Sequence, residues 1–178
     1  MALSLFFVFM AQEIMTTDQS AKAVRRMAYQ VAEYYFGIPQ LVVLGLIPRG
    51  RALAKLLVEE LNQLEHAPKL QFHHLEKHQA LPPELSPQLA GKPVLLVDDV
   101  LFSGNTLFEA LQAVMSARPS SVQVAVLVDR GDRLVPISPI VVGLELGATR
   151  QQYVTVELTP EGQGLSAWLH DQKPPSRS

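Results

Sequence analysis

Apolar residues recur along this chain with two different periods, and the two periods alternate. In residues 16–35 the apolar positions follow helical spacing, and Thr16 with Gln19 forms a capping-box pattern, so this segment is predicted to be a helix. Residues 41–46 form a continuous apolar run with β-branched members, which is typical of a buried strand. Helical spacing returns in residues 53–61. The first third of the chain is therefore predicted to read helix, strand, helix.

The same alternation continues toward the C-terminus. Further strands are predicted at 70–75, 94–97, 122–128, 140–142 and 153–158, and a further helix at 106–116. Strands that alternate with helices form right-handed βαβ units, so we expect an α/β fold with a doubly wound, mainly parallel sheet covered on both faces. No internal repeat and no second domain is evident, and one domain is expected over residues 16–170.

The two ends of the chain differ from this pattern. The start, MALSLFFVFM, has about nine mostly apolar residues, too few to span a bilayer, and it lacks the basic start and cleavage site of a signal peptide. We interpret residues 1–15 as an N-terminal extension without a role in the chemistry, with an extra strand or a partner-binding segment as the alternatives. Residues 171–178 are polar and predicted to be disordered, and Trp168 is predicted to anchor this tail to the domain.

Composition narrows the class of protein. With 178 residues, 48% of them hydrophobic and 18% charged, the chain has the balance of one globular domain. It has no cysteine, which excludes disulfides, cysteine-based zinc sites and thiol nucleophiles and fits a cytoplasmic protein. The net charge of −2 gives no overall attraction to nucleic acid or to an anionic membrane, so no membrane partner is expected.

Candidate chemistry concentrates in the stretch VLLVDDVLFSGNT, residues 94–106. Ligands of parallel sheets bind at the carboxyl ends of the strands, and this loop leads from a strand into a helix, so its backbone N–H groups and the Ser103 and Thr106 hydroxyls can converge on an anion. Gly104 allows close approach of the backbone. Asp98 and Asp99 can accept hydrogen bonds from a diol or bind Mg²⁺. The alternative is a pair of aspartates that merely ends a strand, but the loop that follows favours the anion site.

This stretch closely resembles the phosphoribosyl-pyrophosphate (PRPP) signature of the type I phosphoribosyltransferases. Together with AVLVDRGDRLVPI at 125–137 and VRRMAYQVAE at 24–33, it makes the chain similar to the PyrR subfamily of pyrimidine operon regulators and uracil phosphoribosyltransferases. The resemblance covers residues 14–158. It implies the type I phosphoribosyltransferase fold with a reduced hood, transfer of ribose 5-phosphate from PRPP to a nucleobase with Mg²⁺ as cofactor, and a homodimer.

The resemblance also implies roles for individual residues. Asp98, Asp99 and Arg49 form the predicted catalytic set: the aspartates hold the ribose hydroxyls and bind Mg²⁺ through PRPP, and Arg49 neutralises the leaving pyrophosphate. The predicted PRPP-binding residues are Pro48, Arg49, Gly50, Asp98, Asp99, Phe102, Ser103, Gly104, Asn105 and Thr106. The predicted base-binding residues, in segments that would build the hood, are Val128, Asp129, Arg130, Gly131, Val142, Gly143 and Leu144. Related enzymes often carry a cis peptide in the pyrophosphate loop, so the Ile47–Pro48 bond is predicted to be cis.

Departures from the subfamily leave other functions open. The segment 70–92 is shorter than in relatives and lacks most of the charges of their mobile loop, and Asn105 and Leu144 stand where relatives often have a cation. One alternative is an RNA-binding regulator that senses pyrimidine nucleotides, with Lys22, Arg25 and Arg26 as a small basic cluster. Another is a nucleotide-binding protein without catalysis. Uracil as the base rests on the resemblance, and hypoxanthine and guanine remain open.

Overall fold

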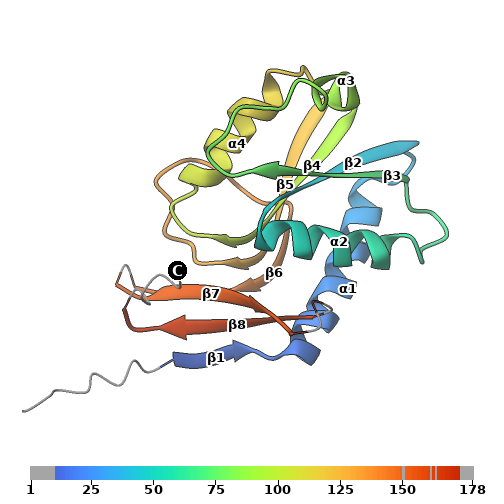
Figure 1. Cartoon of the computed structure of the whole chain (residues 1–178). Helices are drawn as coiled ribbons and strands as arrows, with labels where there is room; N and C mark the ends of the chain where they lie inside the picture. The colour runs from blue at the N-terminus through green and yellow to red at the C-terminus, as the bar shows by residue number, and fades with distance from the viewer. Residues whose placement is uncertain (1–10, 150, 161, 163, 173–178) are drawn as a thin grey trace, which may run out of the picture.

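The computed structural model describes residues 11–149, 151–160, 162 and 164–172. The predictions for residues 1–10 and for most of the C-terminal tail, 173–178, lie outside the described residues. The chain is built from two sheets and the helices that pack on them (Figure 1). The larger sheet has five strands in the order β3-β2-β4-β5-β6, and the smaller has three in the order β1-β8-β7.

The five-stranded sheet is parallel throughout. Its strands are β2 (Gln40–Ile47), β3 (Lys69–Glu76), β4 (Pro93–Leu101), β5 (Ser121–Asp129) and β6 (Val141–Glu145). The central strands are continuous apolar runs because both of their faces are covered, which is what parallel sheets require. This confirms the predicted α/β class and the predicted mainly parallel sheet.

Helices cover both faces of this sheet. α1 (Thr17–Tyr34) and α2 (Arg49–Leu61) pack on one face, and α3 (Ser86–Leu89) and α4 (Asn105–Met115) pack on the other. The strands divide accordingly, since Leu41 and Val43 join the core under α1 and α2 while Val42 and Leu44 join the core under α4. Among the described residues, no helix combines the length and the apolarity needed to cross a membrane.

The capping box predicted at the start of α1 is present. The Thr16 hydroxyl accepts a hydrogen bond from the backbone N–H of Gln19 at 3.3 Å, and the Gln19 side-chain oxygen accepts one from the backbone N–H of Thr16 at 2.8 Å. These two bonds satisfy donors that the first helical turn leaves open, so the start of α1 is set by two residues that are three positions apart in the sequence.

The three-stranded sheet joins the two ends of the chain. It consists of β1 (Ala11–Met15), β8 (Leu165–His170) and β7 (Tyr153–Leu158), all antiparallel. The strand predicted at 153–158 is present as β7, but it pairs antiparallel with β8 and so lies outside the parallel sheet. β1 lies within the predicted N-terminal extension and pairs with β8, so at least residues 11–15 are part of the fold.

Trp168 has a different place from the one predicted. It lies on β8 between Glu13 of β1 and Thr155 of β7, is half-buried, and donates a hydrogen bond from Nε1 to the Ser166 hydroxyl at 3.0 Å. Alternate residues of a strand face opposite sides, and the buried side of β8 carries Ala167 and its neighbour Leu165. The main-chain pairing of β8 with two strands therefore also holds this segment on the domain.

Candidate active site

The acidic pair lies within β4, near its carboxyl end. The strand continues to Leu101, four residues beyond its predicted end, and Asp98 is paired in register with Val126 of β5. The Asp98 side chain is 2% exposed and that of Asp99 is 10% exposed. Oδ1 of Asp98 accepts a hydrogen bond from the backbone N–H of Asp99 at 2.9 Å. Buried carboxylates need such partners, because an unpaired buried charge is costly.

Lys77 supplies the strongest of these contacts and was not predicted. Its Nζ lies 2.8 Å from Oδ1 of Asp98 and 3.5 Å from Oδ1 of Asp99, and its side chain is 25% exposed. Lys77 is the first residue after β3. The rule that parallel sheets bind ligands at the carboxyl ends of their strands applies to the end of β3 as well as to the end of β4, and it is the signal that could have found this residue.

These contacts shift the titration of the site. Burial raises the pKa of Asp98 to about 8, repulsion by Asp99 adds to this, and attraction to Lys77 opposes it. For Lys77, burial favours the neutral amine, but attraction to Asp98 and Asp99 outweighs burial and raises the pKa above its ordinary value. The two buried carboxyl groups are therefore stabilised either by binding a proton or by a neighbouring cation.

The start of α2 lies directly against this acidic pair. A Cβ atom on Gly50 would lie 2.6 Å from the carbonyl oxygen of Val97 and 2.8 Å from Cα of Asp98, so only glycine fits here. Pro48 and Arg49 are exposed beside it, and the Ile47–Pro48 bond is cis, as predicted. No side chain among the described residues caps this helix, so its first N–H groups are available to an anion.

The predicted phosphate loop, residues 102–106, leads from β4 into α4. Gly104 is the N-cap of α4 with φ +83°, a conformation that favours glycine, and a Cβ there would lie 2.6 Å from Cγ2 of Val135. The carbonyl of Ser103 accepts a hydrogen bond from the N–H of Leu134 at 2.9 Å, which fixes the loop. No described side chain caps the start of α4, so the helix that follows the acidic pair in the chain also begins with N–H groups that are available to an anion.

The predicted base-binding segments lie in the parallel sheet and its loops. Val128 and Asp129 end β5, Arg130 and Gly131 follow it, and Val142, Gly143 and Leu144 lie on β6. They lie outside the three-stranded sheet of β1, β8 and β7, and their role in binding a base stays a prediction. A hollow of about 480 Å³ beside these strand ends is lined by Asp129, Arg130, Gly131, Arg133, Glu145, Leu146 and Gly147.

The charged side chains in this region hold the loops together. Arg130 is buried, its guanidinium lies 4.0 Å from the centre of the Phe102 ring, and it donates to the carbonyl of Thr149 at 2.8 Å. Burial lowers the pKa of Arg130, opposed by attraction to neighbouring groups. The carboxylate of Asp129 accepts from the N–H of Gly131 at 2.9 Å. These contacts hold the Arg130 guanidinium and the Asp129 carboxylate against the surrounding loops.

Two members of the predicted basic cluster on α1 have partners inside the molecule. Arg25 forms an ion pair with Glu60 of α2, with Nε 3.2 Å from Oε2. Arg26 donates to the backbone carbonyls of Val142 and Gly143 on β6. Both contacts join α1 to its neighbours, which leaves Lys22 as the member of the cluster that is exposed without such a contact among the described residues.

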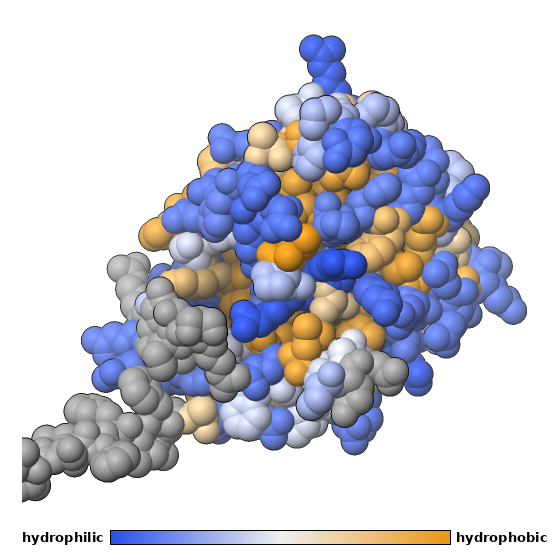
Figure 2. All heavy atoms as spheres, viewed as in Figure 1, coloured by the Kyte–Doolittle hydropathy of each residue, from blue (hydrophilic) through white to orange (hydrophobic). Residues whose placement is uncertain are grey.

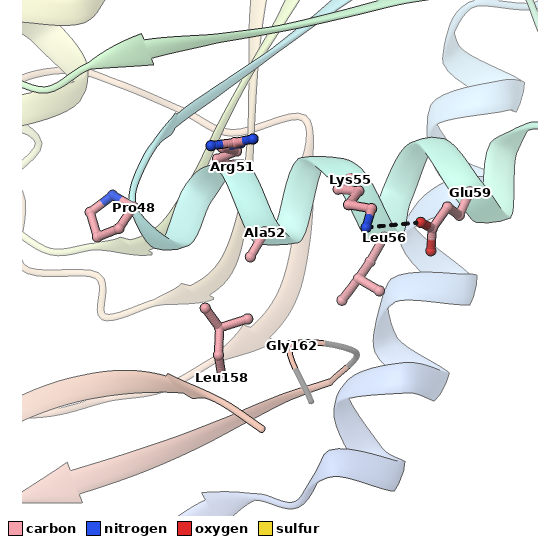
Figure 3. A pocket seen from close by; sticks show the side chains of 8 residues that line it. All are labelled: Pro48, Arg51, Ala52, Lys55, Leu56, Glu59, Leu158 and Gly162. Atoms are coloured by element: carbon pink, nitrogen blue, oxygen red, sulfur yellow. Dashed lines mark ion pairs between the residues drawn. The ribbon is translucent and has the colours of Figure 1, made fainter. Parts of the chain in front are cut away.

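A groove of about 600 Å³ runs between α2 and the β7–β8 hairpin (Figure 3). It is lined by Pro48, Arg51, Ala52, Lys55, Leu56, Glu59, Leu158 and Gly162, and Lys55 pairs with Glu59 at 3.8 Å. The same side of the molecule shows mostly polar side chains with apolar ones exposed between them (Figure 2). The groove meets the candidate site only at Pro48, and neither aspartate of the acidic pair lines it.

The residues fit Mg²⁺ only as a partner of a substrate. The described residues contain no group of three or more histidine, cysteine or acidic side chains that could hold a metal ion. Mg²⁺ is usually bound by one or two carboxylates together with substrate phosphates, and Asp98 and Asp99 provide two carboxylates.

Known proteins are similar to this chain over most of its length. Residues 10–151 match the family model of the phosphoribosyl transferase domain. A bifunctional protein PyrR of Limosilactobacillus reuteri is 38% identical over 162 residues, which cover 83% of this chain and 91% of the relative. A pyrimidine operon regulatory protein of Lactococcus lactis is 34% identical over 157 residues, covering 83% and 90%.

Solved structures share the fold. A hypoxanthine-guanine phosphoribosyltransferase of Bacillus anthracis matches with a TM-score of 0.68 at 15% identity, covering 87% of this chain and 96% of that one. A hypoxanthine phosphoribosyltransferase of Staphylococcus aureus matches with a TM-score of 0.64 at 17% identity, covering 80% of each chain. At such identities the likeness shows the fold alone. The chain belongs to the phosphoribosyltransferase family, and its curated relatives include proteins named PyrR.

Proposed function

We propose that this protein transfers ribose 5-phosphate from PRPP to uracil, giving UMP and pyrophosphate. The observation that carries the proposal is the buried Asp98–Asp99 pair, which has the uncapped start of α2 packed against it and is followed in the chain by the uncapped start of α4. PRPP has the same order of groups: a pyrophosphate, a ribose diol and a 5′-phosphate. Helix N-termini bind phosphate groups, and carboxylates accept hydrogen bonds from a diol.

The proposed reaction breaks the bond between C1 of ribose and the pyrophosphate oxygen while a ring nitrogen of the base attacks C1 and loses its proton. Positive charge develops on the ribose ring, and negative charge develops on the leaving pyrophosphate. Arg49 and the first N–H groups of α2 would stabilise the leaving group, and Asp98 and Asp99 would position the sugar. Mg²⁺ bound through PRPP would add charge neutralisation at the same place.

Uracil is the proposed base because a relative at 34% identity is named a pyrimidine operon regulatory protein. Backbone groups of 128–131 and 142–144 would contact it. We also propose a cytoplasmic homodimer, as the family resemblance implies. The same relative supports a second candidate function, regulation of pyrimidine genes through RNA. Lys22 is the exposed cation of the α1 cluster for such a contact, and RNA binding should weaken steeply with salt.

The proposal is tested by pyrophosphate release from PRPP and Mg²⁺ with uracil, orotate, hypoxanthine, guanine or adenine as acceptor. Release should depend on uracil, and Asp99→Asn should reduce it by at least about 100-fold because the diol loses a charged acceptor. Asp18→Asn, at an exposed aspartate in the first turn of α1, is the matched control and should retain activity. A folded protein that binds PRPP and releases pyrophosphate with none of the bases would contradict the proposal.

A further inference from the structure

Three of the large apolar side chains that the described residues leave exposed lie together at the end of α1. Tyr34 is the last residue of the helix, and Phe36 and Ile38 follow it in the turn that leads to β2. Phe36 is the most exposed of the three, at 74%. Apolar surface is favourably removed from water, so a cluster of this kind marks an interaction surface. We call Tyr34, Phe36 and Ile38 the apolar patch.

A hollow of about 380 Å³ opens beside this patch, at the amino ends of β2, β4 and β5. Its apolar lining includes Tyr34, Tyr35, Ile38, Pro39 and Pro93. Tyr35 is 3% exposed, and its hydroxyl has no hydrogen-bond partner among the described residues. A buried hydroxyl without a partner is costly, so this one is available to donate to a carbonyl of a bound chain. Apolar walls with one free donor suit an apolar peptide segment.

The chain itself contains such a segment. Residues 1–10, MALSLFFVFM, include nine apolar residues, three of them phenylalanine, and no charged residue. They precede β1 and lie outside the described residues. Like the patch, this segment gains free energy when it is removed from water, so the two match in chemistry.

The length of the chain decides which copy can supply the segment. Residues 1–10 join the domain at β1, which leads into the start of α1, whereas the apolar patch lies at the end of α1 (Figure 1). α1 has 18 residues and therefore spans about 27 Å. An extended chain covers about 3.4 Å per residue, so within one molecule about eight residues would be needed to cover this distance. Too few would remain to fill the hollow, whereas a second copy can supply the whole segment.

We propose that residues 1–10 of one copy dock in the hollow and on the apolar patch of a second copy, where the Tyr35 hydroxyl donates to a backbone carbonyl of the segment. Each copy carries both the segment and the hollow, so two copies can exchange segments about a two-fold axis. The hollow lies at the opposite end of β4 from Asp98 and Asp99, so docking leaves the candidate active site open. The inference does not depend on the proposed function.

Disulfide formation between introduced cysteines tests the contact in the full chain, which has no cysteine of its own. Ser4→Cys lies in the segment, and Ser120→Cys lies at the exposed rim of the hollow. The two single variants are incubated together and oxidised, and the products are identified by mass spectrometry. With one cysteine in each chain, only a contact between copies can link positions 4 and 120. This product should exceed at least about tenfold the product of Ser4→Cys with Asp18→Cys, an exposed control at the start of α1, because docking raises the effective concentration.

A substitution in the patch gives a second measurement. Phe36→Ser, introduced into the Ser120→Cys chain, should reduce the 4–120 product at least about tenfold, because the patch loses its most exposed ring. Tyr29→Ser is the matched control, since Tyr29 is also an exposed aromatic residue of α1 but lies outside the lining of the hollow, and the product should not change. Both variants should unfold at the same urea concentration as the parent chain, because the side chains that they remove are exposed.

Three results would overturn the inference. Absence of the 4–120 product from folded single variants would refute the docking. A disulfide that forms only when both cysteines are in one chain would assign the segment to its own copy. Flotation of the wild type with phosphatidylcholine vesicles, together with absence of the 4–120 product, would assign the segment to a lipid surface.

Discussion

Replacing Asp98 with asparagine should stabilise the folded protein at pH 8, although it removes a residue that the proposed function needs. The pKa of Asp98 is raised from 3.8 to about 8, first by burial and then by repulsion from Asp99. A carboxyl group whose pKa is higher in the folded state than in the unfolded state destabilises the folded protein. The effect appears at every pH at which the unfolded chain has released the proton. Asparagine keeps the shape and an acceptor oxygen without the charge.

The sign and the size follow from the two pKa values. Below about pH 3.8 Asp98 is protonated in both states and contributes nothing to the pH dependence. Between that pH and about 8 the unfolded chain releases the proton and the folded chain keeps it, so stability falls as pH rises, by at most about 1.4 kcal/mol per pH unit. The effect on stability is therefore largest near pH 8, and urea unfolding can measure a difference of about 2 kcal/mol.

Urea unfolding at pH 4.5 and pH 8 measures this difference. The free energy of unfolding of Asp98→Asn minus that of the wild type should be small at pH 4.5 and should grow to at least about 2 kcal/mol at pH 8. The exposed control Asp18→Asn should stay within about 0.5 kcal/mol of the wild type at pH 8. A difference for Asp98→Asn that does not grow with pH, or a loss of stability at pH 8, would refute the reasoning.

Three further substitutions test the packing around the site. Gly50→Ala places Cβ 2.6 Å from a backbone oxygen. Urea unfolding should show a loss of stability of about 1 to 3 kcal/mol, although alanine has the better helix propensity. Gly147→Ala is the control, because Cβ there enters open space and stability should hardly change. Gly104→Ala forces φ +83° on a residue with a side chain, and calorimetry should show PRPP binding weakened at least about tenfold. Arg26→Ala should cost about 1 to 2 kcal/mol in urea unfolding because two carbonyls of β6 lose their donor, and Lys22→Ala should cost little; equal losses would contradict this assignment.

Most of the parallel sheet could be predicted because its strands are buried on both faces and are therefore continuous apolar runs. β1 and β8 could not, because each buries only one face. In β1, AQEIM, only Met15 is buried, and in β8 the alternation places Leu165 and Ala167 inward among partly exposed residues. Such short alternating segments gain stability only from their antiparallel partners at the other end of the chain, which no local pattern shows.

The acidic pair and the glycine of the phosphate loop could be predicted because residues that are adjacent in sequence form that part of the site. Lys77 was missed, because a single lysine after a strand looks like a solvated charge unless the rule on strand ends is applied to β3 as well, and only the order β3-β2-β4 shows that it reaches Asp98. The prediction of a free basic cluster on α1 also failed because it did not take account of neighbouring elements. Arg25 and Arg26 are exposed by helical periodicity, but α1 lies beside α2 and β6, which supply their partners.

Formation of UMP by the purified protein tests the central claim most directly. PRPP, uracil and Mg²⁺ are incubated with the wild type and with Asp99→Asn, and the nucleotide is separated by chromatography and quantified against pyrophosphate. The account predicts UMP and pyrophosphate in equal amounts from the wild type and a loss of both of at least about 100-fold in the variant. A wild-type protein that is folded and binds PRPP but forms no UMP would contradict it.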